Sequence, residues 1–276
     1  MFKLTDIRIK AISYIILRLN CDYLSYRQLI SEFPWSKKLF KDTINFLFDM
    51  KIIEIKNGKY NICNENKFLY LKKYKYVRIT LNGNRHVSVS EMCIALRDDI
   101  NEYEMGSIML TPNNYYNARE RFNYILRHTL NEKYEYEKNV YTSSREKFLD
   151  KNKIRFFVKF NPTLKSGDYI KIGFYLWIKN YYARTLNEEI KRFNSKFIRE
   201  GLDLSHPVYS AGMEVKFQDG YIYNDPRMEM YPPGITKIDE DKCIILKKFD
   251  YNNKLDFNIL KPVPGSYFIS WSPPDK

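Results

Sequence analysis

Apolar side chains in the first 62 residues follow helical spacing and then change to the alternation of a short β-hairpin. The spacing predicts three amphipathic helices, at 6–19, 26–33 and 37–50. Ser25 stands three residues before Gln28, the spacing of a capping box, and Ser36 stands where it would cap the third helix. Two β-prone runs then flank Asn57-Gly58, a strong hairpin signal because both turn residues need a positive φ. The N-terminal segment is therefore expected to be three helices followed by a hairpin.

The rest of the chain gives mixed signals that become β-rich toward the C-terminus. Helical spacing predicts helices at 91–103, 115–130 and 183–200. Alternation and turn residues predict strands at 74–81, 85–89, 154–160, 169–178, 213–217, 220–224, 243–248, 256–260 and 266–271. Short strands separated by Pro- and Gly-containing turns are typical of antiparallel sheets, and a sandwich is one such arrangement. The predicted fold class is α+β with a β-rich, antiparallel end.

A short polar junction at 64–67 divides the chain. It predicts two domains, residues 1–63 and residues 64–276, and the second is long enough to bury its own core.

The stretch Thr5–Ile62 resembles the winged helix-turn-helix superfamily in the order of its elements. The resemblance implies that the third helix enters the major groove of double-stranded DNA and that the hairpin, the wing, lies on the backbone or minor groove. Lysine can contact phosphates or guanine, and asparagine can pair with adenine. The expected DNA-binding residues are Lys37, Lys38, Lys41 and Asn45 on the third helix and Lys56 and Lys59 on the wing.

A second interpretation of the same segment stays open. Winged helices also serve as protein-interaction modules, and Asp42 and Asp49 reduce the positive field of the third helix.

The charge distribution favours nucleic acid as a partner. The chain carries a formal charge of +13, and residues 1–62 contribute 11 Lys/Arg against 6 Asp/Glu. That segment therefore has about twice the charge density of the remainder, which suits a polyanionic ligand. The alternative is a solvated surface in a lysine-rich proteome.

No stretch reaches about 18 uninterrupted apolar residues, so no membrane span is expected. The four cysteines are widely spaced, which predicts neither a zinc site nor a disulfide framework and favours a cytoplasmic location.

The sharpest catalytic candidate is a set of two carboxylates and a lysine. Asp203 is followed about ten residues later by Glu214-Val215-Lys216, which resembles the PD-(D/E)xK nuclease motif. The resemblance implies that Asp203 and Glu214 hold Mg²⁺ and that Lys216 orients the attacking water. No proline precedes Asp203, and the segment after Lys216 is β-turn-β without the helix that completes that family's core.

Two segments interleave tyrosine with arginine, a composition that can stack on nucleotide bases. They are Tyr115-Tyr116 with Arg119 and Arg121, and Tyr181-Tyr182 with Arg184. In a chain with 24 tyrosines, a core or interface role is the competing interpretation.

Together these patterns predict a DNA-binding protein without a cofactor, in which a winged helix is fused to a β-rich sensing or assembly domain. A regulator or a component of a bacterial or phage-related defence or replication system would have this organisation. A single winged helix covers a short site, so a homodimer or a partner protein is expected. The alternative function is a Mg²⁺-dependent nuclease that uses Asp203, Glu214 and Lys216.

Overall fold

The computed structural model describes residues 3–63, 65–109, 118–128, 133–135, 141–144, 153–234 and 242–275. Within this part of the chain the fold is mixed α+β, with few helices and mostly antiparallel sheets. The predicted β-rich α+β class is therefore correct. No helix among the described residues is long and apolar enough to cross a membrane.

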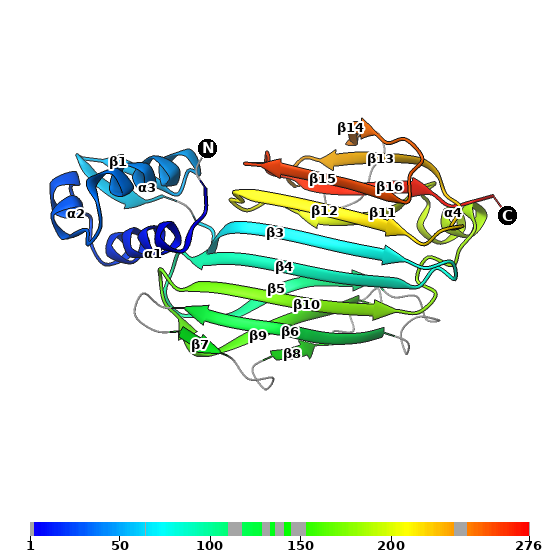
Figure 1. Ribbon diagram of the computed structural model, residues 1–276, viewed down its shortest axis with the longest axis horizontal. Helices are drawn as coiled ribbons and strands as arrows, with labels where there is room; N and C mark the ends of the chain where they lie inside the picture. The colour runs from blue at the N-terminus through cyan, green and yellow to red at the C-terminus, as the bar shows by residue number, and fades with distance from the viewer. Residues whose placement is uncertain are drawn as a thin grey trace.

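Three helices and a hairpin form a unit at one end of the molecule (Figure 1). The helices are α1 (Asp6–Cys21), α2 (Tyr26–Glu32) and α3 (Lys37–Asp49), and the hairpin consists of β1 (Ile53–Lys56) and β2 (Lys59–Ile62). We call α1–α3 with β1–β2 the N-terminal unit.

Local sequence signals account for the boundaries of this unit. Ser25 and Gln28 form the expected capping box, and the Ser36 side chain accepts a hydrogen bond from the backbone N–H of Leu39. Asn57 and Gly58 have φ values of 53° and 72°, so both turn residues occupy the left-handed region that a two-residue hairpin requires. The three predicted helices and the first hairpin are confirmed.

The strands of the rest of the described chain form three sheets. A seven-stranded sheet has the order β15 (Lys254–Leu260), β12 (Ser210–Phe217), β3 (Phe68–Ile79), β4 (Arg85–Ala95), β10 (Tyr169–Ile178), β6 (Ala118–His128), β7 (Lys133–Glu135). A four-stranded sheet has the order β11 (Ile198–Asp203), β16 (Ser266–Ser272), β13 (Asn224–Tyr231), β14 (Ile244–Lys248). A three-stranded sheet has the order β5 (Ile100–Met109), β9 (Lys153–Leu164), β8 (Tyr141–Ser144). Among the named strands of the described chain, the pair β3–β12 alone is parallel.

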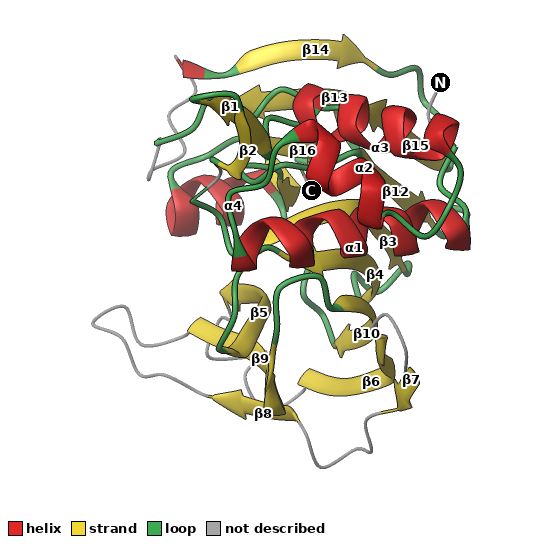
Figure 2. Ribbon diagram, turned by 90° about the vertical axis from the view of Figure 1, so that its left-hand side faces the viewer, coloured by secondary structure: helices red, strands yellow, loops and turns green. Residues whose placement is uncertain are grey.

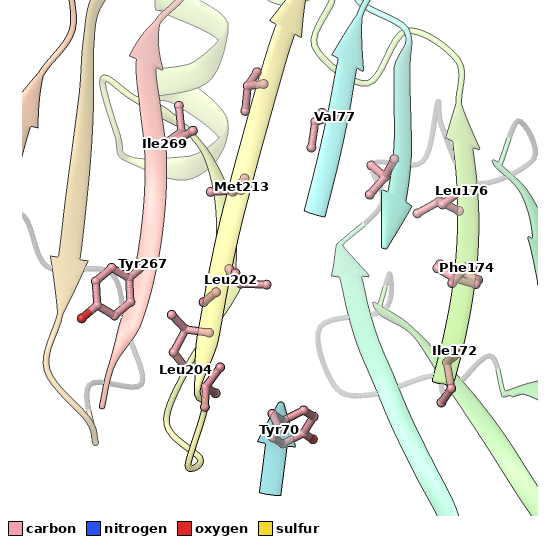
Figure 3. Close-up of a cluster of buried hydrophobic side chains, with 14 of the residues drawn as sticks. Tyr70, Val77, Ile172, Phe174, Leu176, Leu202, Leu204, Met213, Tyr267 and Ile269 are labelled. Carbon is pink, nitrogen blue, oxygen red and sulfur yellow. The ribbon is translucent and has the colours of Figure 1, made fainter. Parts of the chain in front are cut away.

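One large core lies between these sheets. Buried side chains of the seven-stranded sheet, such as Val77, Ile172 and Met213, belong to the same cluster as Ile269 of the four-stranded sheet and Val158 of the three-stranded sheet. Figure 3 shows part of this cluster: Met213 of β12 lies near Leu202 of β11 and Ile269 of β16, and the labelled side chains of β10 lie further across the view. We call the face of the seven-stranded sheet that meets this core its inner face.

A second core joins the N-terminal unit to the outer face of β3 and β4. Leu69 and Leu71 of β3, Ile94 of β4 and the following Leu96 are at most 1% exposed and cluster with the side chains of α1 and α3. Tyr209 adds a ring packed on Phe46 of α3, with centroids 5.2 Å apart. The helices accordingly lie across one end of the sheet rather than beyond a free linker (Figure 2).

This second core explains why the helix predicted at 91–103 is wrong. The segment forms the end of β4 and the start of β5. Cys93 and Ala95 face the large core, while Ile94 and Leu96 face the N-terminal unit. A strand that is buried on both faces has consecutive apolar residues and lacks the alternation of apolar and polar positions. Its sequence pattern therefore cannot be distinguished from that of a buried helix.

Three further predictions are corrected. Residues 118–128 within the predicted helix 115–130 are strand β6, paired with β10, so sheet pairing overrides the helix-forming composition. The predicted helix 183–200 is only α4 (Leu186–Phe193), because Asn194 ends it with a left-handed φ of 50° and residues from Ile198 form β11. The predicted strand 220–224 lies almost entirely outside any strand, and β13 begins at Asn224. The other predicted strands lie on observed strands.

Candidate nucleic-acid interface

The exposed side of α3 carries the residues that the sequence singled out. Lys37, Lys38, Lys41 and Asn45 are all exposed, and at about 100° per residue they fall within an arc of about 100°. The opposite side of the helix is buried in the core of the N-terminal unit through residues such as Phe40. Within the described chain these lysines make no ion pair, so their charges are available to a ligand.

The two acidic residues of α3 are neutralised by cations from other elements. Asp42 lies 3.7 Å from Arg8 of α1, measured between Oδ2 and Nη2. Asp49 lies 2.7 Å from Lys261, which follows β15, measured between Oδ2 and Nζ. Both pairs are partly exposed and add little stability, but they offset the negative charge that opposes a positive α3 surface. These two ion pairs could not be predicted from the sequence, because each pair joins residues of separate elements.

The hairpin presents a second pair of lysines at its tip. Lys56 and Lys59 face each other in the β1–β2 register next to the turn, and both are exposed. Tyr60 holds the hairpin in place, because its backbone N–H donates to Leu24 O at 2.8 Å and its ring lies 5.8 Å from that of Phe48 on α3. The orientation of the hairpin relative to α3 is therefore set by packing.

One exposed aromatic residue at this surface was not identified from the sequence. Tyr26 of α2 is 44% exposed, and its ring lies 5.3 Å from Phe40 of α3 and 6.4 Å from Tyr60 of β2. It lies where α3 and the hairpin meet. Its position in the sequence marks only the start of a helix, so no local signal separated it from the other tyrosines.

The structure does not bring the three nuclease-motif residues together. Asp203 ends β11 in the four-stranded sheet, and its carboxylate accepts hydrogen bonds from the backbone N–H and hydroxyl of Ser205 at 3.1 and 3.0 Å. Glu214 and Lys216 flank the buried Val215 on β12 and thus lie on the outer face of the seven-stranded sheet.

Glu214 is instead engaged with its own neighbours on that outer face. Its Oε2 lies 2.9 Å from Lys254 Nζ and accepts a hydrogen bond from the Tyr74 hydroxyl at 3.5 Å. No group of three or more His, Cys, Asp or Glu residues in the described chain is placed to hold a metal ion. Asp203 and the Glu214/Lys216 pair therefore belong to different sheets in this structure.

One of the two tyrosine–arginine segments is buried away from this surface. Tyr182 is 3% exposed, its hydroxyl donates to Glu200, and Arg184 pairs with Glu189 at 2.7 Å. Tyr181-Tyr182 with Arg184 is therefore a core element. Tyr115 and Tyr116 lie outside the described residues, and Arg119 and Arg121 lie on β6, where side chains are not described.

Comparison with known proteins assigns no family. No protein-family model matches the chain, and no curated protein matches it. Solved structures with partial similarity include a putative protease from Parabacteroides distasonis, with a TM-score of 0.49 and 10% identity over 75% of this chain and 41% of that one. An M1 zinc metallopeptidase from Deinococcus radiodurans has a TM-score of 0.34 and 7% identity over 76% of this chain and 43% of that one. The major pilin SpaD from Corynebacterium diphtheriae has a TM-score of 0.29 and 10% identity over 78% of this chain and 54% of that one.

The chain spans about two fifths of the length of the first two of these proteins. Similarity at this level assigns neither an activity nor a partner.

Proposed function

We propose that this protein binds double-stranded DNA through a winged helix-turn-helix formed by its N-terminal unit. The observation that supports this most directly is the exposed side of α3. It has three lysines and one asparagine, and both acidic residues of the helix pair with cations of other elements. The helix has 13 residues and is thus about 20 Å long, enough to lie in a major groove about 12 Å wide.

Each part of this surface has a distinct expected role. Lys37, Lys38 and Lys41 contact phosphates at the entrance of the groove, and Asn45 reads a base edge, adenine being the preferred partner. Lys56 and Lys59 place the wing on the adjacent backbone. In this proposal the β-rich remainder senses a signal or assembles copies of the protein, as in a regulator or in a defence or replication component, and a dimer extends the short site of one unit.

The test is the salt dependence of duplex binding by the full chain, measured by fluorescence anisotropy. If four lysines neutralise phosphates, log K falls against log[salt] with a slope of about −3.6. Replacing Lys37, Lys38 and Lys41 by Ala removes three contacts, so the affinity falls and the slope becomes shallower by about three. The three side chains are exposed, so the melting temperature is expected to stay within a few degrees.

A matched control removes the same charge from the other end of the molecule. Lys179, Lys191 and Lys248 are exposed, and their replacement by Ala lowers the net charge equally. The slope and affinity of this control are expected to equal those of the wild type. Equal behaviour of the two triple variants would refute the α3 assignment and favour non-specific attraction or a protein partner for this unit.

A further inference from the structure

A cavity of about 470 Å³ lies between the inner face of the seven-stranded sheet and the four-stranded sheet. Its apolar wall includes Val87 of β4, Phe174 and Leu176 of β10, and Leu202 of β11. Figure 3 labels the last three of these side chains. Its polar wall includes Lys75 and Arg85. Cavities of this size with an apolar wall and a few polar groups are typical small-molecule sites.

One buried carboxylate serves both of these cations. Glu200 is 1% exposed, and its Oε2 lies 2.6 Å from Lys75 Nζ and accepts a hydrogen bond from Arg85 Nη2 at 2.9 Å. Its Oε1 accepts from Arg85 Nε and from the Tyr182 hydroxyl. Burial alone would raise the pKa of Glu200, but the charges of Arg85 and Lys75 outweigh burial and lower it, so the carboxylate is ionised.

The cluster therefore has two positive charges and one negative charge. Arg85 is 5% exposed, and its Nη1 has no hydrogen-bond partner among the described residues. Burial lowers the pKa of Lys75, although Glu200 opposes this shift, as expected for a cation that is not fully compensated. A buried charge without a partner is costly, so an anion beside this cluster would be stabilised.

The other end of the cavity has the opposite balance. Glu91, six residues along β4 from Arg85 and thus about 20 Å away, lies 3.5 Å from Lys73. Asp203 and Glu104 also line the cavity as further carboxylates. An anionic group of a ligand is repelled from this end and attracted to Lys75. The charges therefore set the orientation in which a ligand with one anionic end would bind.

We propose that this cavity binds a small molecule with one carboxylate and an apolar body. The carboxylate lies against Lys75 and completes the charge balance with Arg85 and Glu200. The apolar body extends along Val87, Phe174 and Leu202. The site stands apart from the proposed DNA binding, because every residue that carries it lies outside the N-terminal unit.

Isothermal titration of the full chain with octanoate and with phenylacetate tests the proposal. Octanamide and phenylacetamide are matched probes that keep the shape and remove the charge. At least one acid is expected to bind, and to bind at least about tenfold more tightly than its amide, because a charge-assisted hydrogen bond is replaced by a neutral one. Equal affinity of acid and amide, or no binding of either acid at millimolar concentration, would overturn the proposal.

A variant separates the charge from the fold. Lys75→Met leaves Arg85 and Glu200 as a one-to-one pair, so the protein is expected to melt cooperatively and to lose acid binding at least about tenfold. Lys216→Met makes the same chemical change on the outer face of β12 and is expected to bind as the wild type does. Acid binding by Lys75→Met at wild-type affinity would overturn the site. If that variant does not fold, the comparison of acid and amide on the wild type still decides.

Discussion

Deleting residues 1–64 is expected to prevent residues 65–276 from folding cooperatively. The polar junction at 64–67 by itself predicts an independent domain, but the second core crosses that junction. Leu69, Leu71, Ile94 and Leu96 are at most 1% exposed in the full chain because the N-terminal unit covers them. Deletion would expose these four side chains together on one face of β3 and β4.

The size of the effect follows from the area uncovered. Each aliphatic side chain loses about 1.5–3 kcal/mol on exposure, so the four lose about 6–12 kcal/mol. This is an upper value, since unfolded chains already bury some apolar surface. The total stability of a domain is about 5–15 kcal/mol, so the loss is of the same order as the whole. The truncated chain should be insoluble or should lack a cooperative transition.

Differential scanning calorimetry and dye binding to exposed apolar surface measure this outcome. A rescue variant of the truncated chain, with Thr at the four positions, is the control, because Thr keeps the strands and removes the apolar patch. It is expected to be more soluble, whereas the same changes in the full chain are expected to destabilise it. A cooperative melt of the unmodified truncated chain within about 4 °C of the full chain, a difference of about 1 kcal/mol, would refute the reasoning.

Two more predictions follow from buried contacts. Tyr209→Ala removes the ring that packs on Phe46 of α3 and should cost about 3 kcal/mol of unfolding free energy in urea titrations, while Tyr251→Ala, at a position 67% exposed, should change it by under about 0.5 kcal/mol. The pKa of Glu200 is lowered in the folded state, so its contribution to stability is present above its unfolded value of 4.5 and is lost as the pH falls below that value. Between about pH 5 and pH 3 the unfolding free energy of the wild type should therefore fall more steeply than that of Glu200→Gln. Parallel curves for the two proteins would contradict the ion-pair assignment.

The N-terminal unit was predictable because its signals are local. Ser25 with Gln28 and Asn57 with Gly58 act within four residues, and their hydrogen bonds and φ values need no distant partner. The exposure of Lys37, Lys38 and Lys41 also follows from the helical period alone once α3 is assigned.

The failures lie where a distant segment changed the environment of a local pattern. Ile94 and Leu96 read as part of a helix because the N-terminal unit buries the face of β4 that would otherwise be polar. Asp203 and Glu214 read as one motif by their spacing, but strand pairing assigns them to different sheets.

By itself the sequence determined the β-rich α+β class, the helices and hairpin of the N-terminal unit, and the basic side of α3, since these depend on periodicity, caps and turns. Tertiary structure alone decided the shared core, the cations that neutralise Asp42 and Asp49, and the cluster of Lys75, Arg85 and Glu200. The members of that cluster are up to 125 positions apart in the chain and meet only because β3, β4 and β11 belong to facing sheets. A sequence pattern records the order of residues along the chain, whereas buried charge balance depends on which of them pack together in space.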